Sequence, residues 1–274
     1  MEKILTFAIA LLMTVTLSAQ QSNTSQMSLR QQSFAVAMPM VEENIEWQRD
    51  VYRELHLMKD ENAGLYSPAE PSENQKGLFT TLFNLAITKK IPLYRYNIDN
   101  NEVFNETTRA DIRNILTNQH IYFEEQNDNI IVDQSDIPAQ QVMIYYIKEG
   151  IYYDITNSTF RAKVLAICPV LVQEEDYNEK IRYPLFWVKY ADLEPHIKNL
   201  SVIPDYRNKA LVMPMTDYFT LNKYKGDIYK LANPFGQTLR QTVDSDSAYV
   251  EAQIREESQL REVREATYNT YKNK

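Results

Sequence analysis

Glycine is scarce and scattered in this chain, which limits the folds and sites that the chain can form. Only 5 of the 274 residues are glycine, and no two of them are neighbours. A dinucleotide-binding turn needs a close glycine triplet, and a phosphate-binding loop needs glycine directly before lysine. A serine-hydrolase elbow needs glycine on both sides of its serine. The sequence therefore excludes all three sites. The five are Gly64, Gly77, Gly150, Gly226 and Gly236.

The charge balance excludes a second group of functions. Lysine and arginine number 29 and acidic residues 37, so the formal net charge is -8, and no basic run interrupts the acidic chain. Duplex nucleic acid and anionic membranes need a clustered positive field, so we expect neither as the main partner. At 44% hydrophobic residues, the chain can bury a core of its own.

The first 20 residues have the pattern of a secretory signal. Lys3 precedes an apolar run from Ile4 to Leu17, and small residues follow at Ser18 and Ala19. We predict a cleaved signal peptide over residues 1–20. The sole cysteine, Cys168, is far from the signal, so we expect neither a lipid anchor at the new N-terminus nor an internal disulfide. Its apolar surroundings favour a buried side chain over a reactive thiol.

The rest of the chain predicts an α+β fold, with a strand-rich centre between helices. We expect a flexible arm over residues 21–44, an α+β domain over 45–243 and a charged helical tail over 244–274. Helices are predicted over 46–58, 78–86, 107–116 and near 192–200, and helix followed by turn over 218–231. Strands are predicted over 93–98, 121–123, 130–132, 142–147, 151–155, 164–172 and 185–190.

The tail has the composition of a solvated helix. Asp246 and Ser247 can cap its start, and Glu251 with Arg255 has the spacing of a helical ion pair. Few apolar side chains interrupt it. We expect a charged helix that projects from the domain, or a partly ordered tail; a dedicated partner-binding helix is the alternative.

Few residues of the sequence support a catalytic or metal-binding site. The three histidines, His56, His120 and His196, lie in separate elements without a nearby second ligand. Acidic clusters at Glu124–Glu125 and Glu174–Glu175–Asp176 can in principle pair as acid and base, but solvated turns explain them as well. The run 127–129 resembles a calcium loop but lacks its glycine, which favours a hairpin turn.

Tyrosine is abundant, with 19 residues, and two pairs flank a short polar stretch. Tyr145–Tyr146 and Tyr152–Tyr153 lie on two predicted strands, so alternation places one tyrosine of each pair on each sheet face. An outward pair can stack on a sugar ring or a protein partner. The alternative is two amphipathic strands whose phenol ends reach water.

Six stretches, taken in order, resemble the GldN/PorN family of gliding-motility and type IX secretion proteins. The resemblance covers about Trp47 to about Leu239. The stretches are Trp47 to Leu55, Leu65 to Pro68, Tyr145 to Glu149, Ala166 to Leu171, Phe186 to Val188 and Tyr224 to Lys230.

The resemblance implies a non-enzymatic periplasmic subunit at the inner face of the outer membrane. It implies a GldK/PorK-like outer-membrane lipoprotein as partner, self-association within a ring, and contact with the periplasmic part of an inner-membrane motor. It brings no catalytic, cofactor-binding or metal-binding residues to this chain. As interface candidates we name Trp47, Arg49, Tyr52, Tyr152 and Tyr153, together with the C-terminal helix.

Two other functions remain open from the residues alone. A glycan- or peptidoglycan-binding module would use the paired tyrosines. A secreted hydrolase would use Glu124–Glu125 or Glu174–Asp176.

Overall fold

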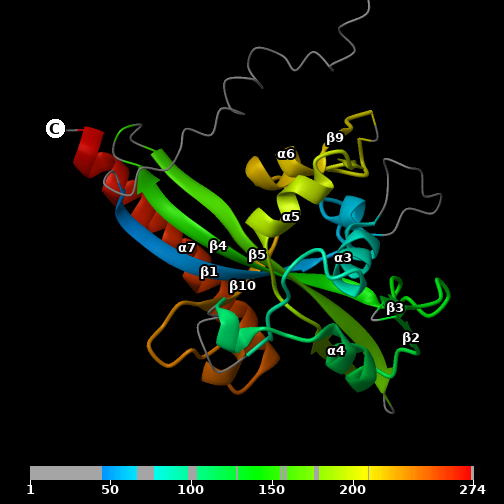
Figure 1. Cartoon of the computed structure of the whole chain (residues 1–274). Coiled ribbons are helices and arrows are strands. Elements are labelled where there is room, and N and C mark those ends of the chain that lie inside the picture. The colour runs from blue at the N-terminus through cyan, green and yellow to red at the C-terminus, as the bar shows by residue number, and fades with distance from the viewer. Residues whose placement is uncertain are drawn as a thin grey trace, which may run out of the picture. The chain divides into compact units, whose positions relative to one another are not determined.

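An antiparallel sheet of six strands is the framework of the protein (Figure 1). Its order is β10-β1-β4-β5-β6, and β7 also pairs with β5. The computed structural model describes residues 45–66, 77–97, 104–127, 129–154, 156, 159–175, 179–208 and 210–272, all within the unit Val41–Lys274. The predicted signal peptide and N-terminal arm lie outside these residues. The sheet strands are β1 (Ile45–His56), β4 (Val142–Asp154), β5 (Thr159–Glu175), β6 (Glu179–Pro184), β7 (Val188–Lys189) and β10 (Asp227–Leu231).

Helices accompany the sheet, so the predicted α+β class is confirmed. They are α3 (Leu78–Ile87), α4 (Ile112–Asn118), α5 (Tyr190–Ile197), α6 (Met215–Thr220) and α7 (Asp246–Lys272), with short 3-10 turns η2 (Ala63–Leu65), η3 (Glu106–Thr108) and η4 (Arg240–Thr242). Two small strand pairs complete the fold: β2 (Glu124–Gln126) with β3 (Asn129–Ile131), and β8 (Ser201–Val202) with β9 (Met213–Pro214).

Strand β1 corrects the helix predicted over residues 46–58. The spacing of four residues between Trp47, Val51 and Leu55 is close to one helical turn of 3.6 residues and is twice the strand repeat, so it does not distinguish the two. The burial pattern decides, because adjacent Val51 and Tyr52 are both fully buried, on opposite faces of the sheet. Val51 lies opposite Leu231 of β10 and Glu149 of β4, so β1 is an inner strand.

Strand β4 corrects another prediction, since the two strands predicted over 142–147 and 151–155 are replaced by one strand over Val142–Asp154. The polar residues between them are buried in the sheet rather than placed in a turn. Lys148 lies 3.1 Å from the carboxylate of Asp50, and Glu149 receives a 2.9 Å hydrogen bond from Arg53. These contacts with β1 compensate the buried charges, which allows the strand to continue.

Three apolar clusters pack on the sheet. The largest lies under α3, α5 and α6 and contains Leu55, Leu82, Tyr145, Ile167 and Leu193. A second, aromatic cluster lies on the Tyr52 face, where the Tyr146 and Tyr229 rings are 4.4 Å apart between centroids and Trp187 is fully buried. The third contains Val51, Ile151, Ile228 and Leu260, and it joins α7 to the sheet.

Other predicted elements are confirmed in part. Helices α3 and α5 form as expected, and α4 replaces the helix predicted over 107–116, beginning at Ile112 after the N-cap Asp111. The predicted strand at 93–98 is reduced to an isolated bridge at Tyr94, and residues 121–123 form no strand. The segment 218–231 ends in strand β10 instead of a turn, because β10 pairs with β1 and its Ile228 and Tyr229 fill two apolar clusters.

The C-terminal segment is a 27-residue helix, α7, which packs on the domain instead of projecting freely. Ala252 and Leu260 on its inner face are buried. The start is capped by Ser245, whose Oγ accepts a 3.2 Å hydrogen bond from the Ala248 amide, while Asp246 lies 2.6 Å from Arg240. In Figure 1, α7 runs along the β1 and β4 side of the sheet.

Candidate interaction site

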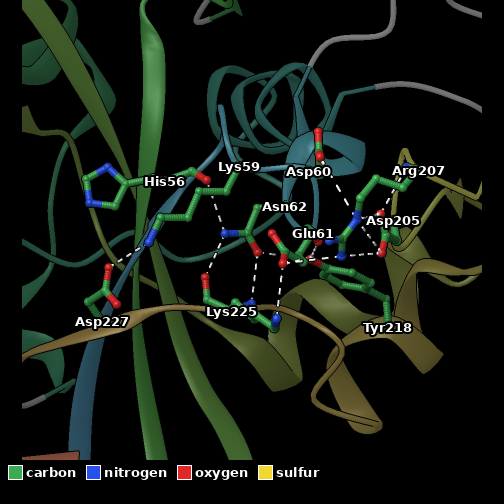
Figure 2. A network of polar contacts seen from close by, with 10 residues as sticks. All are labelled: His56, Lys59, Asp60, Glu61, Asn62, Asp205, Arg207, Tyr218, Lys225 and Asp227. Atoms are coloured by element: carbon green, nitrogen blue, oxygen red, sulfur yellow. Dashed lines mark hydrogen bonds and ion pairs between the residues drawn. The ribbon is translucent and has the colours of Figure 1, made fainter. Parts of the chain in front are cut away.

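Asn62 holds together the loops beside the first strand. Its side chain is buried, donating to the carbonyls of His56 at 3.1 Å and Lys225 at 2.6 Å. Its Oδ1 accepts from the Lys225 amide at 3.0 Å and from the Tyr218 hydroxyl at 3.3 Å. Figure 2 shows Asn62 at the centre of this network. One amide side chain therefore fixes the end of β1, helix α6 and the segment that leads into β10.

Charged pairs surround Asn62 in the same view (Figure 2). Lys59 donates to Asp227 at 2.8 Å, and Lys225 donates to Glu61 at 3.0 Å. Asp205 accepts several hydrogen bonds from Arg207, and these lower the pKa of its carboxyl to about 2. These pairs are largely exposed, so they contribute to the shape of the surface more than to its stability.

Two adjacent residues of β1 attach α7 to the sheet from opposite faces. Arg53 donates to Glu149 at 2.9 Å, to Glu257 of α7 at 2.8 Å and to the Gly226 carbonyl at 3.0 Å. Burial alone would lower the pKa of Arg53, but the carboxylates of Glu149 and Glu257 raise it. Arg53 therefore stays charged.

Glu54, on the other face, is also buried and also bound by α7. It pairs with Arg182 of β6 and accepts from Tyr249 at 3.4 Å and Gln253 at 3.3 Å. Burial favours the neutral acid, but the hydrogen bond from His56 and the Arg182 guanidinium lower the pKa of Glu54. Side chains in the N-terminal half of α7 thus contact residues on both faces of β1.

A groove of about 880 Å³ lies between α7 and this part of the sheet. One wall is made by residues of α7 that recur at helical spacing. The other contains Arg53, Lys59, Tyr224 and Lys225, so the Asn62 network shapes that wall. The α7 wall includes Val250, Ile254, Glu257, Ser258, Arg261 and Arg264.

The predicted interface candidates are divided between surface and core. Trp47, Arg49 and Tyr152 are partly exposed, and the Trp47 ring packs edge-on against Phe160 at 5.6 Å. Tyr52 and Tyr153 are fully buried, so neither offers a contact surface in this fold. The first three remain predictions.

The tyrosine pairs do not form an outward platform. Tyr145 and Tyr153 are fully buried, and Tyr146 is nearly so. Both faces of β4 are covered, which corrects the expectation that one face points to solvent. Tyr152 alone of the four is partly exposed.

The residues named above as catalytic or metal-binding candidates either form structural contacts or lie on separate elements. Glu125 pairs with Arg113, and Asn127 has a positive φ of 52° in the β2–β3 turn, which confirms the hairpin. The side chains of Glu174 and Glu175, and all of Asp176, lie outside the described residues. His56 lies 3.6 Å from Glu54, whereas His120 and His196 are exposed on other elements. Cys168 is buried in the aromatic cluster, as predicted.

The described part of the chain offers neither a cluster of metal-binding side chains nor a membrane-spanning helix. It contains no group of three or more His, Cys, Asp or Glu side chains arranged to hold a metal ion. None of its helices has the length and hydrophobicity needed to cross a membrane.

The family can now be assigned. The family described as "Gliding motility associated protein GldN" matches residues 40–270, which include the sheet, the Asn62 network and nearly all of α7. The chain belongs to the GldN family. No curated protein matches the chain at a significant level. The GldN match extends beyond Leu239, where the sequence resemblance ended, and includes α7 up to residue 270.

Sequence reasoning missed Asn62, Arg53 and Glu257 as organising residues of this GldN protein. Asn62 carries no local signal, since its partners Lys225 and Tyr218 lie more than 150 positions along the chain. Arg53 and Glu54 do not stand out either, because the strand at residues 45–56 contains five other polar or charged residues. The α7 residues that face the groove recur at the helical repeat, and this spacing can be recognised in the sequence.

Proposed function

We propose that this GldN-family protein is a non-enzymatic periplasmic subunit of the type IX secretion and gliding machinery. It assembles with a GldK/PorK-like outer-membrane lipoprotein, associates with further copies of itself in a ring, and contacts the periplasmic part of an inner-membrane motor subunit. The observation that carries this proposal is the family match over residues 40–270.

The use of charge inside the fold supports a structural role. Glu54 and Glu149 are buried and Arg53 is 12% exposed, and each of the three is bound by side chains from other elements. Their hydrogen bonds join β1 to β4, β6 and α7, so they serve to hold the domain together. A rigid domain of this kind suits repeated packing in an assembly.

The test is co-expression of residues 21–274 with the lipoprotein, followed by light-scattering mass and negative-stain imaging of the co-purified material. We expect a stable hetero-complex of megadalton mass or ring shape. A monodisperse monomer that does not bind the lipoprotein would reject the proposal.

The location has its own test. We expect N-terminal sequencing of the protein from the periplasmic fraction to begin near Gln20 or Gln21. Recovery of the intact Met1 terminus in the cytoplasm would contradict the periplasmic assignment.

A further inference from the structure

Two arginines of α7 line the groove with no anionic partner among the described residues. Arg261 and Arg264 both face the groove, and neither has a carboxylate within salt-bridge distance in the part of the chain that the structure describes. The Nε atom of Arg264 is shielded from water and has no hydrogen-bond partner there. A shielded guanidinium nitrogen without an acceptor is costly, and a ligand carboxylate would satisfy it.

The acidic groups of the groove are already engaged. Glu149 and Glu257 bind Arg53, Asp227 binds Lys59 and Glu61 binds Lys225. Five basic and four acidic side chains line the groove, so its formal net charge is +1, whereas the whole chain carries a net charge of -8. This local excess of positive charge favours an acidic ligand.

An apolar pair lies on the same wall of the groove. Val250 and Ile254, one helical turn apart, are 51% and 63% exposed. Side chains of this size are normally buried, and an exposed pair beside a groove is typical of a contact surface. The ten residue steps from Ile254 to Arg264 span roughly 15 Å of helix.

We propose that this groove binds an acidic segment of a partner protein. The segment places an apolar side chain against Val250 and Ile254, and carboxylates against Arg261 and Arg264, which lie roughly 10 and 15 Å along the helix from Ile254. Arginine binds carboxylates with two parallel hydrogen bonds, so this end fixes the direction of the segment. The proposal rests on the assembly role proposed above and assigns a binding surface to it.

Because the only cysteine of the chain is buried, a cysteine introduced in the groove can be labelled selectively. Cys168 is the only cysteine of the chain and is fully buried, so a cysteine introduced on the surface is the one accessible thiol. Ser258→Cys places a thiol-linked benzophenone in the groove between the apolar pair and the arginines. Gln259→Cys is the matched control, because it is exposed on the adjacent position of α7 and does not line the groove.

The experiment irradiates each labelled protein, residues 21–274, with an envelope extract from cells that lack their own copy, and maps the cross-linked peptides by mass spectrometry. We expect a cross-linked segment rich in Asp and Glu from position 258, and at least tenfold less from position 259. Adding the double change Arg261→Glu and Arg264→Glu should remove the product at least tenfold, whereas Arg255→Glu should not, because Arg255 lies outside the groove.

Three results would overturn the proposal: equal cross-linking from both positions, a cross-linked segment without carboxylates, or a product that survives the arginine reversal. Circular dichroism checks that the reversed variant keeps α7, which we expect because neither arginine forms an ion pair with the described residues. Cross-linking to an acidic segment of another protein, without a lipoprotein ring, would reject the proposed function and keep the groove assignment.

Discussion

Arg53 in the first strand donates a 2.8 Å hydrogen bond to Glu257 in the last helix, across 204 positions of sequence. The same guanidinium binds Glu149 in β4. One side chain therefore joins three elements, and it is 12% exposed. The position of α7, and with it the groove, depends on this contact.

Removing the guanidinium should destabilise the fold strongly. Arg53→Ala leaves Glu149 buried without its cation, which costs about 3–5 kcal/mol. Glu257→Gln leaves the Arg53–Glu149 pair intact, so we expect a loss of about 1 kcal/mol. Urea unfolding followed by circular dichroism measures both. Arg255→Ala, at an exposed position of α7, is the control; an Arg53→Ala loss no greater than the control's would show that the contact is incidental.

Asn62 should tolerate no substitution that removes its amide. Asn62→Ala deletes two donated and two accepted hydrogen bonds at a buried site, and we expect a loss of about 2–4 kcal/mol in the free energy of unfolding. Asn114→Ala, an exposed asparagine in α4, should change it by less than about 0.5 kcal/mol. Similar values for the two variants would contradict the central place given to Asn62.

Glu54 should make stability depend on pH. Its pKa in the folded protein lies below the ordinary value of 4.5, so its ionised form stabilises the fold above that pH, and the stabilisation is lost as the pH falls through the folded pKa. The groups facing it are Arg182, His56, Tyr249 and Gln253.

Glu54→Gln tests this dependence. We expect the variant to be less stable than the parent by about 1–3 kcal/mol at pH 7, and the difference to shrink in acid once the parent's Glu54 is protonated. Unfolding by urea at a series of pH values gives the two curves. Parallel curves across the acidic range would show that Glu54 does not carry the effect.

Gly226 should be intolerant of a side chain. A Cβ there would lie 2.5 Å from Leu55 Cδ1 and 3.0 Å from Arg53 Cβ, so the wall of the groove must shift. We expect Gly226→Ala to cost about 1–3 kcal/mol. Gly150→Ala is the control, because its nearest neighbour would be Leu165 at 3.4 Å, an ordinary contact. Equal thermal stability of the two variants would contradict the close packing at Gly226.

The two faces of α7 should respond differently to truncation. Leu260 is 2% exposed, so Leu260→Ala should cost about 2–4 kcal/mol through lost burial and a cavity. Ile254→Ala should leave the free energy of unfolding within about 0.5 kcal/mol, because this side chain faces the groove. Denaturant titration of both variants measures the change in the free energy of unfolding. A large loss of stability for Ile254→Ala would mean that the groove closes in solution.

The sequence predicted the fold class, α3, α5 and α7, and the β2–β3 hairpin, because these depend on local patterns. It failed where the local pattern was ambiguous. The spacing of Val51 and Leu55 fits a helix or a strand, and only the partners β4 and β10 decide between them. Likewise, Lys148 and Glu149 resemble a turn until Asp50 and Arg53 are placed beside them.

The candidate site was the least predictable part. Besides nearby His56, Asn62 binds Lys225 and Tyr218, which are remote in sequence, and such hydrogen bonds produce no periodic pattern in the sequence. Tyr52 and Tyr153 were proposed as contacts because tyrosine favours interfaces, but the inner position of their strands buries them. In contrast, Trp47 and Arg49 lie near the start of β1, where partial exposure persists.

The place of β1 in the sheet also determines when the protein can fold. This strand is made first, yet one of its neighbours, β10, and the helix that compensates Arg53 are made near the end of synthesis. A chain still emerging from the ribosome cannot complete the pairing of β1, and contacts so remote in sequence form slowly. The native sheet can therefore form only after β10 has been made, near the end of synthesis.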